Sequence, residues 1–192
     1  MYIYICVIRK LERERAFKEE KKENEMKMKD SNMGKDSFHS KDCHSDIKLT
    51  KNNLIATNTG GTNVYLSNII SNGEYKWKFK ILKQNGIFIG VWKTNHKINV
   101  NRRISDRDNK GKCYGLMTGD RLLTWGDSEK NRKYGKACVT NDIIEMRLDL
   151  KKREIEFTLN GQSAGIAETN IEQTSYRAVV SMCDGEKLEL LV

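Results

Sequence analysis

Residues 154–167 read Glu-Ile-Glu-Phe-Thr-Leu-Asn-Gly-Gln-Ser-Ala-Gly-Ile-Ala, and this stretch decides the class of fold. Ile155, Phe157 and Leu159 alternate with charged or polar residues, as in a strand that buries only one of its faces. Asn160-Gly161 then interrupts the alternation, which resumes afterwards. An Asn-Gly pair accepts positive φ at both central positions of a type I′ turn, so the stretch predicts a β-hairpin.

The same stretch carries a motif that is typical of serine hydrolases. Residues 161–165, Gly-Gln-Ser-Ala-Gly, match the G-x-S-x-G pattern. In α/β-hydrolases that serine lies on a strand-to-helix turn, and a histidine follows it along the chain. Here the motif begins in a hairpin turn, no helical pattern follows, and the last histidine is His96. We therefore interpret Ser163 as structural and expect no catalytic residue.

Composition limits the class of protein. The sequence has 192 residues, 38% of them hydrophobic, and a formal net charge of +9. This length predicts one domain of ordinary size plus an extension. The cysteines are odd in number and form no C-x-x-C pair, so neither a disulfide framework nor a zinc ribbon is expected. Reduced thiols favour a cytoplasmic or nuclear protein.

Residues 1–46 differ in composition from the remainder. Residues 1–8 are apolar but too short to span a bilayer, and the basic pair that follows does not fit a signal peptide. Residues 9–30 are rich in Lys, Arg, Glu and Met, with i,i+4 pairs that favour a solvated helix. We expect no membrane span.

Residues 31–46 are polar and predict a linker. His39, Cys43 and His44 lie in it, but no fourth ligand is near in sequence, so we expect no metal site. The domain boundary is therefore placed between residues 46 and 47, and residues 47–192 are expected to fold alone.

From residue 47 onward the sequence has the two-residue period of strands. Tyr75, Trp77, Phe79 and Ile81 alternate with lysines, which predicts a half-buried strand with a lysine-coated outer face. An apolar run over 87–92 predicts a central strand. Further strands are predicted as hairpin pairs: 114–117 with 122–125, 144–148 with 154–159, and 177–182 with 188–192, the last turning at Asp184-Gly185. Many short strands at close spacing predict an all-β fold, a twisted antiparallel two-sheet β-sandwich.

The order of these segments resembles the SPRY domain, a module of tripartite-motif ligases, SOCS-box adaptors, ryanodine receptors and several RNA-associated proteins. The resemblance covers residues 47–192. The motifs that carry it are residues 73–79 (Gly-Glu-Tyr-Lys-Trp-Lys-Phe), 89–92 (Ile-Gly-Val-Trp), 134–135 (Tyr-Gly), 141–149, 155–167, Tyr176 and 179–181 (Val-Val-Ser).

The resemblance implies a sandwich of the concanavalin A-like kind whose loops at one edge bind partners, usually short peptide segments. In SOCS-box adaptors, a tyrosine on a mid-domain strand and the loop of the last hairpin line that site. The resemblance assigns these positions to Tyr114 and to Cys183, Asp184 and Gly185. The tryptophan that the adaptors carry in this loop is absent, and Cys183 stands near its place.

Positive charge is concentrated in one segment. Residues 47–192 contain 24 Lys and Arg against 16 Asp and Glu. Residues 93–112 alone contain seven cations and two acids. Clustered cations attract anionic partners, and long loops in compact domains are often functional. A solvated loop, an acidic-peptide site and an RNA or phosphate site all remain open. RNA-binding surfaces usually interleave aromatic residues, which this loop lacks, although Trp125 could supply one.

We therefore predict a non-enzymatic intracellular protein–protein interaction module that binds a short peptide segment, with an acidic partner favoured by charge. The alternative is an RNA- or phosphate-binding domain that uses the basic loop. No cofactor is expected, and the oligomeric state is open. The candidate partner-binding residues are Lys93, Lys97, Arg102, Arg103, Arg107, Tyr114, Trp125, Cys183, Asp184 and Gly185.

Overall fold

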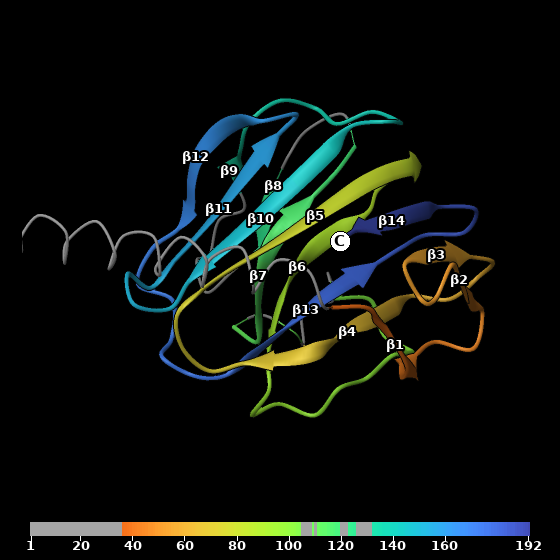
Figure 1. The fold of residues 1–192 in the computed structure, drawn as a ribbon, viewed down its shortest axis with the longest axis horizontal. Helices are drawn as coiled ribbons and strands as arrows, with labels where there is room; N and C mark the ends of the chain where they lie inside the picture. Colours follow the sequence, from red (N-terminus) through yellow and green to blue (C-terminus); the bar gives the residue numbers. More distant parts are fainter. Residues whose placement is uncertain (1–35, 105–108, 110, 120–122, 126–131) are drawn as a thin grey trace, which may run out of the picture. The chain divides into compact units, whose positions relative to one another are not determined.

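The computed structural model describes residues 36–104, 109, 111–119, 123–125 and 132–192, which form an all-β fold of two antiparallel sheets (Figure 1). In spatial order, sheet A contains β1 (Phe38–Cys43), β4 (Asn63–Ile70), β13 (Tyr176–Ser181), β6 (Phe88–Lys93), β7 (Cys113–Met117), β8 (Leu123–Trp125) and β9 (Arg132–Lys133). Sheet B contains β12 (Gln162–Glu168), β11 (Glu154–Leu159), β10 (Ile143–Asp149), β5 (Glu74–Lys83), β14 (Lys187–Leu191), β3 (Ile55–Asn58) and β2 (Ile47–Thr50). Within these ranges no helix is long and apolar enough to cross a membrane.

The predicted two-sheet sandwich is confirmed, and its core lies between the sheets. Strand β5 buries Trp77, Phe79 and Ile81, and its intervening lysines are half-exposed, as the alternation predicted. From sheet A, β6 and β13 contribute apolar side chains to the same cluster, among them Ile89, Val91 and Val180. The two-residue period therefore indicates which side of each strand faces the other sheet.

The hairpin of β11 and β12 is confirmed with its predicted turn. Asn160 and Gly161 have φ of 51° and 79°, the left-handed pair that a type I′ turn requires. The Asn160 side chain also accepts a hydrogen bond of 2.8 Å from the backbone N–H of Ile143. The turn therefore closes its own hairpin and also bonds to β10, the strand on the other side of β11.

The predicted final hairpin is wrong, because β13 and β14 belong to different sheets. Strand β13 pairs with β4 and β6, whereas β14 pairs with β5 and β3. Gly185 makes a turn with φ of 76°, as its sequence suggested, but the chain crosses from one sheet to the other there. All six residues of β13 are buried, which is typical of a central strand and requires partners on both sides.

The predicted linker over residues 31–46 contains a strand. Strand β1 pairs with β4, and Phe38 is completely buried in the main core. The carboxylate of Asp36 accepts hydrogen bonds from the indole N–H of Trp77 at 3.0 Å and from the backbone N–H of Ser67 at 3.0 Å. One buried aromatic residue in a polar sequence is enough to hold an edge strand. The helix predicted over 9–30 and the apolar residues 1–8 lie outside the described residues.

The long connection between β6 and β7 packs on the outer face of sheet A. Ile98, Val100 and Ile104 cover a second apolar cluster on the side of the sheet away from the main core. The sheet residues of this second cluster are Tyr65, Phe88, Trp92, Cys113 and Val179. The described residues 94–104 of this connection therefore pack on the sheet and leave Lys97, Arg102 and Arg103 exposed.

Candidate functional site

Three connections meet at one edge of the sandwich, and we call residues 59–62, 97–103 and 182–185 the three-loop edge. Thr62 joins them. Its carbonyl accepts a hydrogen bond of 2.8 Å from the backbone N–H of Met182, and its hydroxyl donates to the carbonyl of Val100. The connection after β6 therefore runs beside the ends of β4 and β13 (Figure 1).

Asn58, the last residue of β3, forms hydrogen bonds with two of these loops, 59–62 and 182–185. Its side chain is 1% exposed. Its amide nitrogen donates to the carbonyls of Gly61 and Met182, both at 2.8 Å. Its amide oxygen accepts from the backbone N–H groups of Gly60 and Gly61, at 3.0 and 2.6 Å. One carboxamide thus satisfies backbone groups from residues far apart in sequence and fixes the loops relative to each other.

Glu186 fixes the 182–185 loop in the same way, by hydrogen bonds from its buried side chain to the backbone. It is 1% exposed, and its carboxylate accepts hydrogen bonds from the backbone N–H groups of Asn85, Gly86 and Cys183. A buried carboxylate that accepts several N–H bonds is well compensated for its loss of water. Neither Asn58 nor Glu186 was expected from sequence, because a buried polar residue that bonds to backbone leaves no pattern in the chain.

The 97–103 loop is anchored to β4 by a second buried asparagine. Asn63 is completely buried, and its amide donates to the carbonyl of Asn99 at 3.1 Å and to the carbonyl of Arg102. The loop also bonds to itself, since the Asn99 side chain accepts from the Asn101 N–H at 3.0 Å. These bonds hold the backbone of the loop while its charged side chains extend outward.

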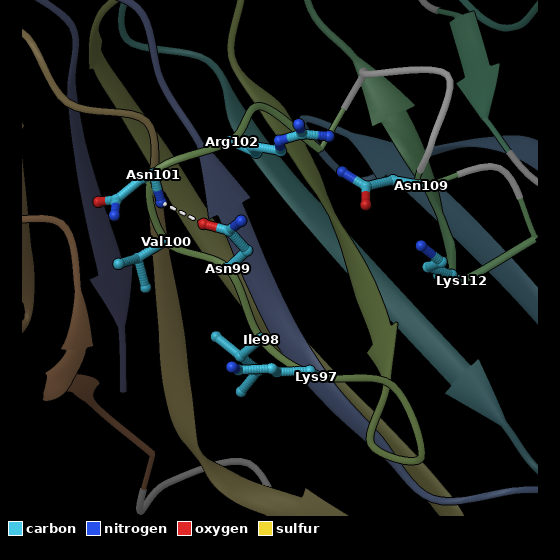
Figure 2. Close-up of a pocket in the computed structure, with 8 residues that line it drawn as sticks. All are labelled: Lys97, Ile98, Asn99, Val100, Asn101, Arg102, Asn109 and Lys112. Carbon is cyan, nitrogen blue, oxygen red and sulfur yellow. Dashed lines mark hydrogen bonds between the residues drawn. The ribbon is translucent and has the colours of Figure 1, made fainter.

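A pocket of about 520 Å³ opens between this loop and residues Asn109 and Lys112 (Figure 2). Figure 2 shows Lys97, Arg102 and Lys112 on three sides of it, with Asn109 between Arg102 and Lys112. The other lining residues are Ile98, Asn99, Val100 and Asn101. The described lining residues are therefore cations, carboxamides and two aliphatic side chains.

The structure brings together two of the predicted groups of site residues. Lys97, Arg102 and Arg103 are exposed on the loop, as is Asp184 on the neighbouring loop, where Cys183 and Gly185 are half-buried. Thr62 stands between the two groups. Arg107 lies outside the described residues, and so does the side chain of Trp125, of which only the backbone in β8 is described.

Lys93 and Tyr114 do not lie on the surface as expected, because both are buried. Tyr114 is 2% exposed, and its ring centre lies 6.1 Å from that of Tyr176 within the main core. Lys93 is 3% exposed, with its ammonium 2.7 Å from a Glu172 carboxylate oxygen and 5.1 Å from the Tyr114 ring centre. The Lys93 ammonium thus makes a cation–π contact with Tyr114 and an ion pair with Glu172. We therefore interpret Lys93 and Tyr114 as structural residues that stabilise sheet A.

The outer face of sheet B is a poorer candidate because two of its lysines, Lys76 and Lys78, form ion pairs. The ammonium of Lys78 lies 3.3 Å from Glu145 on the adjacent β10, and that of Lys76 lies 3.9 Å from Glu74. On the same face, Arg147 contacts Glu156 at 2.7 Å. These pairs of opposite charge offset one another on the outer face of sheet B. The domain's excess of cations lies instead in residues 93–112, part of which forms the three-loop edge.

No metal centre is found among the residues that the structure describes: no group of three or more His, Cys, Asp or Glu side chains could hold an ion. Cys43, one of the three candidate ligands in sequence, is half-buried, and burial raises the pKa of its thiol to about 11. A thiol that stays protonated at neutral pH is a poor metal ligand and a poor nucleophile.

Comparison with known families now identifies the fold. The family model of the SPRY domain matches residues 74–192. The chain belongs to the SPRY domain family. The suspected resemblance is thus confirmed, and SPRY domains are protein-interaction modules that are not typically catalytic.

Solved structures agree with this SPRY assignment. The crystal structure of the TRIM65 PSpry domain matches with a TM-score of 0.69 at 14% identity, over 84% of this chain and 92% of that one. The crystal structure of the SPRY domain of human HERC1 matches with a TM-score of 0.60 at 22% identity, over 80% of this chain and 96% of that one. At these identities the likeness supports the fold alone.

Proposed function

We propose that this SPRY domain binds a short peptide segment of a protein partner at the three-loop edge, and that the segment is acidic. The observation that carries the proposal is the meeting of the basic loop with the 182–185 loop at Thr62. Exposed Lys97, Arg102 and Arg103 give the edge a positive charge, which raises the rate of encounter with acidic segments. The buried anchors Asn58 and Asn63 hold the loops in place, so little ordering is needed on binding.

A capture experiment with matched variants tests this proposal. The full chain is immobilised as the wild type, as Arg102→Glu with Arg103→Glu, and as Lys151→Glu with Lys152→Glu. The last pair is exposed at the turn between β10 and β11 and matches the charge change. We expect a partner that the wild type and the control retain and the Arg102/Arg103 variant loses. Equal retention by all three proteins, each with an unchanged melting temperature, would contradict the proposal.

An RNA- or phosphate-binding domain is the second candidate function, and one observation favours it. The described lining of the pocket combines three cations with three asparagines, a set of donors that suits phosphate oxygens. Nuclease treatment of the lysate distinguishes this function from the first, since a peptide partner is retained after nuclease. A steep fall of affinity with salt would also favour nucleic acid, because binding then releases counterions.

A further inference from the structure

Three Asn-Gly pairs lie in the chain, at residues 72–73, 85–86 and 160–161. An asparagine side chain can lose ammonia when the backbone nitrogen of the next residue attacks its carboxamide carbon. Glycine in that next position favours the attack, because it has no Cβ to obstruct it and its backbone adopts many conformations. The reaction needs a carboxamide that can rotate and a backbone nitrogen that can give up its proton. Hydrogen bonds to either group therefore decide which pair reacts.

At residues 160–161 the fold holds the carboxamide. The oxygen of the Asn160 side chain accepts a hydrogen bond of 2.8 Å from the backbone N–H of Ile143, the first residue of β10. Its nitrogen donates a hydrogen bond of 2.8 Å to the Asp142 carboxylate. Rotation of this carboxamide requires both bonds to break, which opposes an attack by the Gly161 nitrogen.

At residues 85–86 the fold holds the attacking nitrogen instead. The backbone N–H of Gly86 donates a hydrogen bond to the Glu186 carboxylate, which also accepts the N–H of Asn85 at 2.5 Å. Because Glu186 is 1% exposed, water does not compete for these bonds. A nitrogen anion at Gly86 would face the negative charge of this carboxylate, so the N–H resists the loss of its proton.

Neither kind of protection is present at residues 72–73. Asn72 is exposed and Gly73 is half-buried in the connection between β4 and β5. Among the residues that the structure describes, no hydrogen-bond partner is found for the Asn72 side chain or for the Gly73 N–H. The Gly73 carbonyl accepts the N–H of Leu150 at 2.9 Å, which leaves the Gly73 nitrogen unused. The space around this glycine is open, since an added Cβ would meet only a ring carbon of Tyr75, at 3.9 Å.

We propose that Asn72 is a site of spontaneous deamidation, with water as the co-reactant. The Gly73 backbone nitrogen loses its proton to solvent and forms a bond to the Asn72 carboxamide carbon. The bond from this carbon to the side-chain nitrogen then breaks, and the nitrogen leaves as ammonia after taking a proton from solvent. Water opens the cyclic imide at either of its carbonyls, which gives aspartate or isoaspartate. Both products carry a new carboxylate, and isoaspartate also adds one atom to the backbone before β5.

This modification is independent of the proposed peptide function. Asn72 follows the end of β4, whereas Thr62 of the three-loop edge precedes the start of the same strand. The new charge therefore lies at the far end of β4 from the proposed docking site, and partner binding there should not change. The atom that isoaspartate adds lies beside the Gly73 carbonyl that accepts the Leu150 N–H. Formation of isoaspartate should therefore weaken the pairing of β5 with β10 at this end.

Mass spectrometry of the aged full chain tests the proposal, because trypsin places each Asn-Gly pair in a peptide of its own: residues 52–76, 84–93 and 154–177. Native and urea-denatured chains are incubated in mildly alkaline buffer, and the replacement of NH2 by OH is followed at each pair. In the native chain Asn72 should react at least about tenfold faster than Asn85 or Asn160, since a charge-assisted hydrogen bond protects each of those pairs. In urea the three rates should become similar. Equal rates in the native chain, or no reaction at Asn72 there, would overturn the proposal.

Two variants test the cause of the selectivity. Asp142→Ala removes the acceptor of the Asn160 amide, so it should raise the rate at Asn160 by about five- to tenfold and leave Asn72 unaffected. Asn72→Gln should abolish the product in peptide 52–76 and leave the other two peptides unchanged. An unchanged melting temperature confirms folding of each variant. A folded Asp142→Ala with an unaltered rate at Asn160, or product in peptide 52–76 of Asn72→Gln, would contradict the assignment of Asn72 as the reactive residue.

Discussion

Ser163 shows how one residue can suggest an activity that its surroundings do not support. Its hydroxyl donates a hydrogen bond of 2.6 Å to the Glu156 carboxylate and accepts one of 3.0 Å from the backbone N–H of Gly165. The hydroxyl is thus a donor to a carboxylate on the exposed face of an edge hairpin, where the G-x-S-x-G pattern forms part of strand β12. We therefore keep the structural interpretation of this serine.

A pH prediction follows from this contact. The pKa of Glu156 lies below its ordinary value, mainly because of the Ser163 hydrogen bond, with the Arg147 guanidinium adding to the effect and burial opposing it. A carboxyl with a lowered folded-state pKa stabilises the fold above its unfolded pKa, and this stabilisation is lost as pH falls through the folded pKa. Ser163→Ala should therefore raise the Glu156 pKa and lower stability at neutral pH, with the difference from the wild type narrowing in acid. Carboxyl carbon NMR titration measures the pKa, and labelling of Ser163 by a fluorophosphonate would contradict its structural role.

Gly90 illustrates a residue that packing requires. In the register of β6 and β7 it faces Gly115, and the Phe88 ring lies over both. A Cβ at Gly90 would lie 2.8 Å from the Cα of Gly115 and 2.8 Å from the Phe88 ring, and would also meet the carbonyl of Tyr114. Gly90→Ala should thus lower the free energy of unfolding by about 1–3 kcal/mol, the usual effect of overpacking. Gly86→Ala is the control in urea denaturation, because its nearest contact is an ordinary 3.9 Å, and equal midpoints for both variants would refute the packing argument.

At the scale of elements, strand β1 leads us to propose that the domain begins at residue 36. It covers the edge of β4, buries Phe38 and follows Asp36, which bonds to the indole of Trp77. A fragment 36–192 should unfold cooperatively with the stability of the full chain. A fragment 47–192 should be less stable by at least about 3 kcal/mol, the lower end for the loss of a buried phenylalanine. Urea denaturation of the two fragments decides the point, and equal midpoints would support the boundary expected from sequence at residue 47.

The elements that could be predicted from sequence are those whose signals are local. Asn160-Gly161 sets a turn by its own backbone preference, and the alternation in β5 shows its buried side wherever the strand is placed. The sheet that β14 joins could not be predicted, because that depends on pairing with strands far away in sequence. Ile98 and Val100 did carry a usable signal, two apolar residues at the spacing of a strand, but the surrounding charge favoured a solvated loop.

The candidate site could also be predicted only in part, because only some of its features have a local signal in the sequence. Clustered charge at Arg102 and Arg103 is visible in the chain, and loops that carry such clusters lie at the surface. The burial of Tyr114 depends on β7 being covered by the opposite sheet, which no local pattern reports. Asn58 bonds to the carbonyl of Met182, 124 residues away, so its role follows only from the assembled fold.

At the scale of the whole molecule, the outer face of sheet B and the three-loop edge differ in the charge that they present to a partner. On the outer face of sheet B, Lys78 pairs with Glu145 on the adjacent strand and Lys76 pairs with Glu74 on its own strand. The three-loop edge carries Lys97, Arg102 and Arg103 on a segment with a large excess of cations. A field of this kind acts mainly on the rate of association, since it steers an anionic partner before contact is made.

The kinetic prediction is therefore specific. Arg102→Glu with Arg103→Glu should slow association with an acidic partner segment by about tenfold or more at low salt and should flatten the dependence of the association rate on ionic strength. The control pair Lys151→Glu with Lys152→Glu makes the same change in net charge at the turn between β10 and β11, so it should alter association much less. Stopped-flow fluorescence over a range of salt concentrations provides the rates. If both double variants slow association equally, net charge alone governs the association rate, and the three-loop edge is not the docking site.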